Sequence, residues 1–429
     1  MNHIISIDKL YNLFLQSTGV CTDTRNIAQD NIFFCLKGEN FNGNKFAKDA
    51  LEKGASFVIV DEKQYQLNEQ CILVDDTLKT LQELAFFYRQ KLNIPIIGIT
   101  GTNGKTTTKE LVCAVLSKKY KVYATKGNLN NHIGVPLTLL SINPADAEIA
   151  IVEMGANHIG EIAELCEIAQ PDFGIITNIG KAHLEGFQSI DGVIRTKKAL
   201  YDAVKKKSGT LFVNADDELL MTHSENSKRI LYGNTGNITG DFLSDKLYLT
   251  FVLSDYSVEI QTQLTGNYNF PNAMAAVAVG LHFDVSVEDI KMALENYKPD
   301  NNRSQVIRKE EKTIIIDAYN ANPSSMQAAI ENLMKISSPH KAVLLGDMFE
   351  LGEESKLEHQ RIVNILKTAN IQYVYLLGEA FSKTDANASW KYTDFDTLAN
   401  ALHQQLPNEV TILIKGSRSM KMERFLDIV

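Results

Sequence analysis

The stretch GITGTNGKTTTKEL, residues 98–111, follows the apolar segment IPII and opens a helical pattern. An apolar strand, a glycine-rich turn and a helix in this order predict a phosphate-binding loop. Gly101 and Gly104 allow backbone conformations that aim successive N–H groups at phosphate oxygens, and the helix N-terminus adds partial positive charge. We expect Lys105 to contact the outer phosphates of a nucleotide and the Thr106 hydroxyl to ligate Mg²⁺.

This loop is a G-x-x-G-K-T variant, because the strict Walker A pattern would place a glycine where Ile99 stands. The alternative is a glycine turn whose lysine and threonines are only polar surface. The strand before the loop and the helix after it favour ATP binding. The residues expected to bind ATP here are Gly101, Thr102, Asn103, Gly104, Lys105, Thr106 and Thr107.

Around the loop, the sequence predicts an α/β fold with three domains. Apolar strands such as EIAIVEMG and TLFVNAD alternate with helical patterns after residue 93, which indicates a mostly parallel sheet with crossover helices. Residues 246–264 are typical of an antiparallel hairpin at one edge of that sheet. The alternation restarts after a polar stretch near Pro299. We expect domains at residues 1–92, 93–300 and 301–429.

Composition narrows the functional classes. The formal net charge of −9 argues against nucleic-acid binding, which normally uses a basic surface. Five cysteines fall at no metal-ligand spacing, and no apolar run is long enough to span a bilayer. Asp8 and Lys9 interrupt the stretch where a signal peptide needs apolar residues. We expect a cytoplasmic protein, monomeric by default, that binds small molecules and neither nucleic acid nor membrane.

Several polar residues follow predicted strands near the loop. Glu153 ends the strand EIAIVE and His183 follows DFGIITNI, so both are expected at the carboxyl edge where open α/β sheets bind ligands. A carboxylate suits Mg²⁺, whereas an imidazole is more often a hydrogen-bonded loop residue. Glu153 could equally be a strand-end carboxylate that faces water. Lys197, taken alone, reads as a solvated helical lysine.

The ordered series of motifs resembles the Mur ligase family. Besides the loop, it comprises GNLNNHIGVPLTLL, VEMGANHIGEI, NIGKAHLEGF, DAYNANPSSM, LGDMFELGEES and IKGSRSM, from about residue 21 to residue 421. The resemblance implies an N-terminal UDP-binding domain, a central ATPase domain and a C-terminal domain. Within the family, NANPSSM and KGSRSM are similar to the member that adds D-alanyl-D-alanine to UDP-N-acetylmuramoyl-tripeptide through an acyl phosphate, in peptidoglycan precursor synthesis.

The resemblance also assigns roles to residues. It implies catalytic roles for Lys105, Glu153, His183 and Lys197, and metal binding by Thr106, Glu153, His183 and, once carbamylated, Lys197. It implies nucleotide contacts at Asn269 and Asn272 on the adenine side, Arg303 on the phosphates and Asp317 on the ribose. Implied substrate-binding residues are Thr22, Asp23, Thr24, Arg25, Asn128, Asn130, Asn131, Tyr319, Asn320, Asn322, Lys415, Ser417 and Arg418.

These assignments leave alternatives open. Each asparagine could instead cap a helix or a turn, and the other polar residues could belong to surface loops. The stretch LKGENFNGNKFA also resembles the family in outline, but Asn44 stands where a histidine is common in the family, so the resemblance does not extend to a ligand contact at this position. Rival activities are a ligase that adds the third amino acid, a folate-polyglutamylating relative, and a P-loop GTPase or regulatory module. The D-N-P-R element typical of the diamino-acid ligase is absent, and NANPSSM and KGSRSM favour the dipeptide-adding member over both ligase rivals. No N-K-x-D guanine element occurs, and a GTPase or regulatory module would not need the UDP-sugar turn. No motif indicates whether the third residue of the tripeptide is lysine or diaminopimelate.

Overall fold

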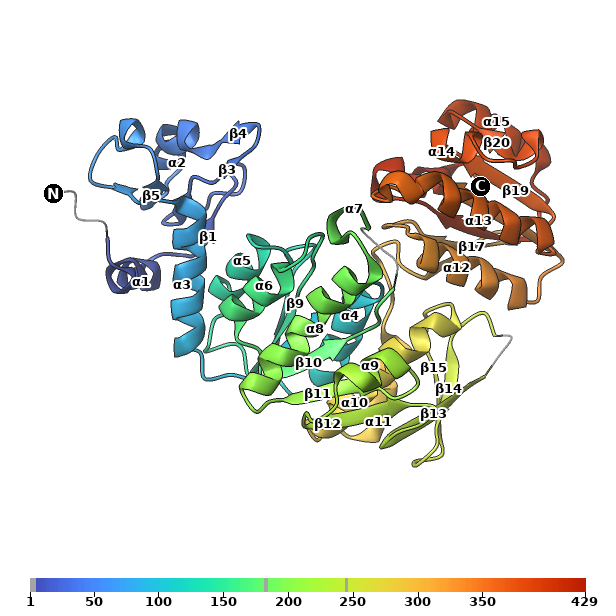
Figure 1. Cartoon of the computed structure of the whole chain (residues 1–429), viewed down its shortest axis with the longest axis horizontal. Helices are drawn as coiled ribbons and strands as arrows, with labels where there is room; N and C mark the ends of the chain where they lie inside the picture. Colours follow the sequence, from blue (N-terminus) through green and yellow to red (C-terminus); the bar gives the residue numbers. More distant parts are fainter. Residues whose placement is uncertain (1–4, 181–183, 244–245) are drawn as a thin grey trace.

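The computed structural model describes residues 5–180, 184–243 and 246–429. The fold is α/β, as the sequence predicts, and it contains three main sheets of four, nine and six strands. Figure 1 shows the N-terminal part in blue and the C-terminal part in orange and red at opposite ends of the molecule, with the large central sheet between them. In the ranges described, no helix combines the length and apolar character that a membrane crossing requires.

The N-terminal sheet is parallel throughout. In spatial order its strands are β1 (Val20–Cys21), β2 (Ile32–Phe34), β5 (Phe57–Val60) and β6 (Cys71–Leu73). A separate antiparallel hairpin joins β3 (Lys37–Gly38) to β4 (Phe41–Asn42). The helices of this part are α1 (Ile7–Gln16), α2 (Ala47–Glu52) and α3 (Thr77–Lys91).

Helix α3 connects the N-terminal part to the central sheet. Its first turn is capped by the Asp76 side chain, which accepts a hydrogen bond from the Lys79 amide. The Tyr88 hydroxyl donates to the carbonyl of Ile142 at 2.5 Å, and the buried Arg89 pairs with Asp172 at 2.7 Å. One hydrophobic core therefore continues across the expected boundary at residue 92, and Figure 1 shows α3 standing between the two sheets.

The central sheet is parallel from β8 to β13 and ends in an antiparallel hairpin, so the edge predicted to differ in direction is confirmed. In spatial order its strands are β15 (Val258–Gln261), β14 (Thr250–Leu253), β13 (Ile238–Leu243), β12 (Arg229–Gly233), β11 (Thr210–Asn214), β10 (Phe173–Ile176), β7 (Ile96–Thr100), β9 (Ile149–Glu153) and β8 (Val122–Ala124). Ile97 and Ile99 face one core and Ile96 the other, which explains the continuous apolar run of β7.

Helices cover both faces of the central sheet (Figure 1). They are α4 (Lys105–Leu116), α5 (Gly134–Leu140), α6 (Glu161–Ala169), α7 (Leu184–Phe187), α8 (Ile190–Lys206), α9 (Glu218–His223), α10 (Phe270–His282) and α11 (Val287–Asn296). Helices α4, α10 and α11 contact one another on one face, and α6 and α8 contact each other on the other face. This layering leaves the carboxyl edge of the parallel strands open for a ligand.

The C-terminal sheet has its own core between two helical layers. In spatial order its strands are β16 (Gln305–Lys309), β17 (Lys312–Asp317), β21 (Val410–Lys415), β18 (His340–Gly346), β19 (Tyr373–Leu377) and β20 (Lys391–Tyr392). Only β16 runs antiparallel within this described sheet. Its helices are α12 (Pro323–Lys335), α13 (Ser355–Thr368), α14 (Glu379–Ser382) and α15 (Phe395–Gln405).

Candidate functional site

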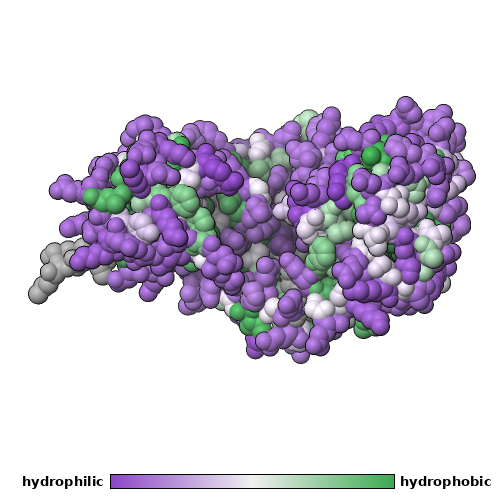
Figure 2. Space-filling model, turned by 90° about the horizontal axis from the view of Figure 1, so that it is seen from above, coloured by the Kyte–Doolittle hydropathy of each residue, from purple (hydrophilic) through white to green (hydrophobic). Residues whose placement is uncertain are grey.

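A cavity of about 590 Å³ lies where the carboxyl ends of β7 and β9 face those of β17 and β21. Figure 2 shows the surface hollowed between the two ends of the molecule, with mostly hydrophilic residues around the hollow. Most of the expected site residues line this cavity: Thr102, Asn103, Gly104, Lys105, Thr106, Thr107, Asn128, Asn130, Asn131, Glu153, Asn269, Asn272, Arg303, Asp317, Tyr319, Asn320, Asn322 and Lys415. The fold thus brings together residues from two sheets that are far apart in sequence.

The glycines of the phosphate loop are required by its geometry. Gly101 has φ of +149°, and a Cβ there would lie 1.9 Å from the Thr177 hydroxyl oxygen. Gly104, which directly precedes the first residue of α4, is in the left-handed conformation with φ of +79°. A Cβ at that position would lie 2.6 Å from the side-chain oxygen of Asn272. Any side chain at either glycine would therefore displace the loop.

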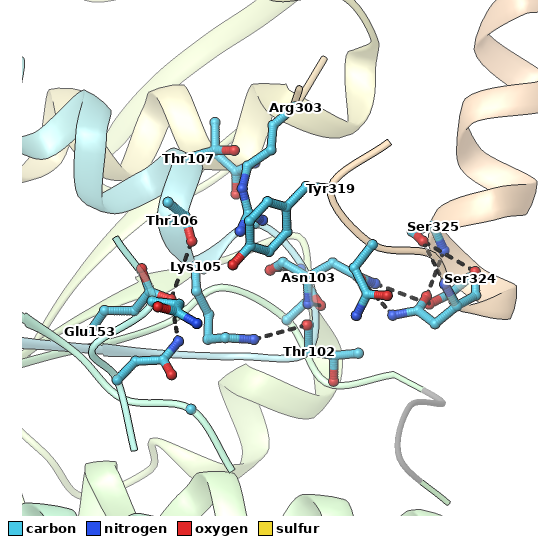
Figure 3. Close-up of a pocket in the computed structure, with 18 of the residues that line it drawn as sticks. Thr102, Asn103, Lys105, Thr106, Thr107, Glu153, Arg303, Tyr319, Ser324 and Ser325 are labelled. Carbon is cyan, nitrogen blue, oxygen red and sulfur yellow. Dashed lines mark hydrogen bonds between the residues drawn. The ribbon is translucent and has the colours of Figure 1, made fainter. Parts of the chain in front are cut away.

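Lys105 lies folded over the loop that precedes it (Figure 3). Its ammonium donates to the carbonyl of Gly101 at 2.8 Å and to that of Thr102 at 3.1 Å. Burial lowers the pKa of Lys105, the negative charge of Glu153 raises it, and the positive charge of Arg303 lowers it further. A polyanion in the cavity would offset both the burial and the repulsion from Arg303, because it supplies negative charge beside the ammonium.

Glu153 is buried at the end of β9 with 1% of its surface exposed. Its Oε1 accepts hydrogen bonds from the Thr106 hydroxyl at 3.2 Å and the Asn130 amide at 2.8 Å. Its Oε2 is also buried and has no hydrogen-bond partner among the residues that the structure describes. A buried carboxylate oxygen without a partner beside a threonine hydroxyl fits a hard cation such as Mg²⁺.

The described residues contain no group of three or more His, Cys, Asp or Glu side chains arranged to hold a metal ion. Mg²⁺ does not require such a group, because it commonly binds one or two carboxylates and completes its shell with waters and substrate phosphates. The donor set of Glu153 and Thr106 therefore fits a nucleotide-associated ion. His183, a further expected ligand, lies outside the described residues.

Lys197 on α8 is 2% exposed, contrary to the solvated lysine that its sequence context alone indicates. Burial is the main cause that lowers its pKa to about 7; the positive charge of Lys105 adds to this and Glu161 opposes it. Its Nζ lies 5.5 Å from the centre of the Phe187 ring. The next residue, Lys198, instead pairs with Asp202 at 2.5 Å near the surface.

The two asparagines expected on the adenine side form a buried chain of hydrogen bonds. The Asn272 amide donates to Asn269 at 2.9 Å, and its oxygen accepts from the Thr108 hydroxyl of α4 at 3.1 Å. Asn269 in turn donates to the Ser304 hydroxyl at 3.0 Å, and Tyr268 shares that hydroxyl at 3.1 Å. The chain of hydrogen bonds connects α4 to the segment that enters the C-terminal sheet. The helix-cap alternative is wrong for both residues, because the Asn269 side chain makes no capping bond and Asn272 lies within α10.

The C-terminal side of the cavity carries concentrated charge. The guanidinium of Arg303 stacks on the Tyr319 ring at 3.5 Å, as Figure 3 shows, and its buried Nε has no partner among the described residues. Asp317 accepts from Lys415 at 2.5 Å and from the Ser304 amide at 3.2 Å. Because Lys415 is 2% exposed, its ammonium depends on Asp317 as a counter-ion.

Two expected groups lie elsewhere. Ser417 and Arg418 line a second cavity of about 450 Å³, which shares Asn320 with the first. The turn of Thr22, Asp23, Thr24 and Arg25 follows β1 in the N-terminal part and is not among the residues lining either cavity. There the side-chain hydrogen bond from Arg25 lowers the pKa of Asp23 to about 2.

Asn44, in the neighbouring stretch of the N-terminal part, is fully buried. It donates to the Asp61 carboxylate at 2.8 Å, and its own oxygen accepts from the Asp61 amide at 3.1 Å. Its amide thus holds the chain where β5 ends, which is a structural use of the side chain. Both polar atoms of the Asn44 side chain are thus engaged by Asp61, within the N-terminal part itself.

Sequence reasoning missed several residues that line the cavity. They are His132, Asn157, His158, Glu161, Asn178, Tyr268, Ser304, Ser324 and Ser325. Asn178 follows β10, which pairs directly with β7, so the strand-end rule applied to Glu153 would also have found it. No comparable signal marks Ser304, because its partners lie up to 39 residues away along the chain.

Three family models match successive parts of the chain. They are the Mur ligase family catalytic domain at residues 16–89, the Mur ligase middle domain at 99–280 and the Mur ligase glutamate ligase domain at 302–418. The chain belongs to the Mur ligase family. The three matches leave gaps at the end of α3 and at the segment before Arg303.

Individual members of the Mur ligase family resemble this chain over nearly its whole length. The UDP-N-acetylmuramoyl-tripeptide--D-alanyl-D-alanine ligase of Bacillus subtilis is 36% identical, covering 95% of this chain and 92% of the relative. The Escherichia coli ligase of the same name is 33% identical, covering 94% and 92%. Among solved structures, MurF from Acinetobacter baumannii has a TM-score of 0.85 at 29% identity, and MurF from Thermotoga maritima in complex with ADP has 0.85 at 26%; each covers 97% of both chains.

Proposed function

We propose that this chain is the ATP-dependent ligase that joins D-alanyl-D-alanine to UDP-N-acetylmuramoyl-tripeptide, which yields UDP-N-acetylmuramoyl-pentapeptide, ADP and phosphate. The observation that carries the proposal is the shared cavity, in which the phosphate loop faces charged residues of the C-terminal sheet. Relatives that are 36% and 33% identical over almost the entire chain bear the name of this activity. The solved relative with bound ADP supports an adenine nucleotide as the phosphoryl donor.

The reaction proceeds in two steps. In the first, the terminal carboxylate of the tripeptide attacks the γ-phosphorus of ATP, the bond to ADP breaks, and an acyl phosphate forms. In the second, the amine of D-alanyl-D-alanine attacks the activated carbonyl, loses a proton and expels phosphate. Catalysis of the first step consists mainly of alignment and charge neutralisation, which the loop N–H groups, Lys105 and Arg303 supply. The ammonium of Lys105 exchanges the loop carbonyls for phosphate oxygens when the nucleotide binds.

Glu153 and Thr106 hold Mg²⁺ in this proposal, with His183 as a further ligand. When bound, the ion neutralises charge on the nucleotide phosphates. Lys197 contributes once CO₂ has converted its amine to a carbamate, which replaces a cation with an anion. Only a neutral amine reacts with CO₂, and a pKa of about 7 leaves a large share of Lys197 neutral at physiological pH.

The substrates divide between the domains proposed at residues 1–92, 93–300 and 301–429. The first binds the uridine diphosphate through Thr22, Asp23, Thr24 and Arg25, whose hydroxyls and guanidinium suit a diphosphate. The second binds ATP, and Asn128, Asn130 and Asn131 face the muramoyl peptide. The third binds D-alanyl-D-alanine through residues around Asn320, Lys415 and Arg418. Enclosure between the domains excludes water, which would otherwise hydrolyse the acyl phosphate. We place the reaction in the cytoplasm, with a monomer as the active form.

Phosphate release separates this proposal from its rivals. If the chain is this ligase, phosphate release requires UDP-N-acetylmuramoyl-tripeptide, ATP and D-alanyl-D-alanine together, and the product contains the dipeptide. Solved structures of a diaminopimelate-adding ligase and a folylpolyglutamate synthase share the fold at 17% and 13% identity. Release that is independent of the dipeptide, or that needs a single amino acid or glutamate in its place, contradicts the proposal.

A further inference from the structure

The side chain of Asn103 leaves the phosphate loop and reaches the C-terminal part of the chain (Figure 3). Its Nδ2 donates to the Ser324 hydroxyl at 3.0 Å, and its Oδ1 accepts from the Asn322 amide at 2.8 Å. Both partners lie at the start of α12, more than 200 residues further along the chain. The amide that sequence reasoning assigned to the nucleotide is therefore engaged between the domains.

The three side chains form a closed ring of hydrogen bonds. The Ser324 hydroxyl, which accepts from Asn103, donates to the Oδ1 of Asn322 at 3.0 Å. That Oδ1 also accepts from the Ser325 amide at 2.9 Å and so caps α12. Each donor in the ring has an acceptor, and such cycles polarise one another in a partly buried setting. The ring is directional, so it fixes both separation and orientation.

Each side of this ring is anchored in its own domain. The backbone N–H of Asn103 donates to the side-chain oxygen of Asn178 at 3.0 Å, and the backbone carbonyl of Asn103 accepts from the Thr177 hydroxyl at 2.5 Å. On the opposite side, Asn322 is the capping residue of a 13-residue helix. Because both ends of the ring are held by further hydrogen bonds, the ring fixes the position of α12 relative to the phosphate loop.

Helix α12 has a second contact with the central domain. Near its other end, the Asn332 amide donates to the buried Thr265 hydroxyl at 3.2 Å. The strand before α12 carries Asp317, and Tyr319 lies between that strand and the helix, so both move with α12. Docking of α12 therefore determines whether these residues, with Lys415, face the phosphate loop across the cavity.

We propose that Asn103, Asn322 and Ser324 form a latch that docks the C-terminal domain on the phosphate loop, and that they are positioning residues. In this role the Asn103 side chain holds the domain and does not contact the nucleotide, and Asn322 holds it and does not contact the peptide. The importance of the latch for catalysis rests on the proposed ligase function. The latch itself is a property of the chain without substrates and can be tested separately.

Three substitutions test the latch on the full chain. Asn103→Ala and Ser324→Ala each open the ring. Asn322→Ser keeps a good helix cap but is too short to reach Asn103. Small-angle X-ray scattering of the protein alone measures domain separation. The loss of one or two hydrogen bonds is expected to shift the docked-to-undocked ratio roughly 5- to 30-fold towards the undocked form, which increases the radius of gyration.

Ser325→Ala is the matched control, because Ser325 accepts a hydrogen bond from the Asn322 amide on the same helix turn and does not bond to Asn103. It should retain the wild-type scattering profile. Ser324→Thr, which keeps the hydroxyl, should also stay docked, unlike Ser324→Ala. The double variant of Asn103→Ala and Ser324→Ala should open no further than Asn103→Ala alone, because Asn103→Ala already removes both hydrogen bonds of the ring that cross between the domains.

With the tripeptide substrate and the dipeptide saturating and ATP varied, the latch variants should raise KM for ATP more than they lower kcat, because ATP that contacts residues of both domains favours the docked form. Scattering profiles unchanged in Asn103→Ala and Asn322→Ser would overturn the latch, as would equal opening in Ser325→Ala or additive opening in the double variant. A failed ligase reaction in the wild-type protein would instead overturn the proposed function and leave the scattering result valid.

Discussion

Replacing the buried Lys197 with methionine should stabilise the protein and abolish its activity. The amine has a pKa of about 7 in the folded chain, against an ordinary value of 10.5, chiefly because it is buried. Each pH unit between these values corresponds to about 1.4 kcal/mol, so placing this amine in the fold costs about 5 kcal/mol. Methionine has similar length and no charge, so Lys197→Met should recover several kcal/mol, with about 5 kcal/mol as the ceiling.

The sign of the pH dependence follows from proton binding. Between pH 7 and 10.5 the unfolded chain holds more protons at Lys197 than the folded chain does, so the contribution of Lys197 to wild-type stability rises with pH in this window. The penalty is fully present below about pH 7 and disappears above about pH 10.5. The advantage of Lys197→Met should therefore be largest at pH 6 to 7 and should shrink steadily towards pH 10.

Urea unfolding in CO₂-free buffer, at several pH values, measures this difference from the transition midpoint at constant slope. Lys198→Met is the control, because Lys198 forms a partly exposed pair with Asp202, and its loss should change stability by no more than about 0.5 kcal/mol. A Lys197→Met variant that is no more stable than wild type, or whose gain is independent of pH, would refute the burial argument.

Three further predictions concern the cavity. Lys105→Ala should lower kcat about 100- to 1000-fold while leaving the fold intact, as steady-state kinetics and circular dichroism would show; normal turnover would contradict the role of the loop. Glu153→Gln should raise the Mg²⁺ concentration for half-maximal activity at least about tenfold, since it removes the charge but keeps an acceptor for Asn130; an unchanged Mg²⁺ titration argues against a metal ligand. Ser304→Gly, which suits the backbone φ of +49° but lacks the hydroxyl bonded to Asn269, should weaken ATP binding about 5-fold by calorimetry, whereas Asn302→Gly, also at positive φ, should bind ATP normally.

The sequence predicts most of the architecture because the central strands are apolar on both faces. Strands β7, which ends at Thr100, and β9, which ends at Glu153, are recognisable for this reason. The ends of such strands mark the edge of the sheet where a ligand binds. Strands β12, β13, β16 and β20 escaped prediction because sequences such as QVIRK and ITGDFL are short and mixed in polarity.

The rest of the site depends on distant pairing that a single sequence does not display. Lys197 looks solvated in sequence because basic residues surround it, and only the packing of α8 against the central sheet shows that it is buried. The contacts of Asn103 with Ser324 and of Asn332 with Thr265 join residues 221 and 67 positions apart. Such hydrogen bonds follow from how the domains dock, which periodicity and spacing do not determine.

Isotope transfer tests the central claim most directly. The account holds that ATP bound at the phosphate loop phosphorylates the terminal carboxylate of the peptide. Tripeptide substrate labelled with ¹⁸O in that carboxylate should transfer one labelled oxygen to each phosphate released, because the oxygen that attacks phosphorus leaves with it. Mass spectrometry of the phosphate reads this out. Phosphate without ¹⁸O, or ¹⁸O recovered in AMP, would contradict activation as an acyl phosphate at this site.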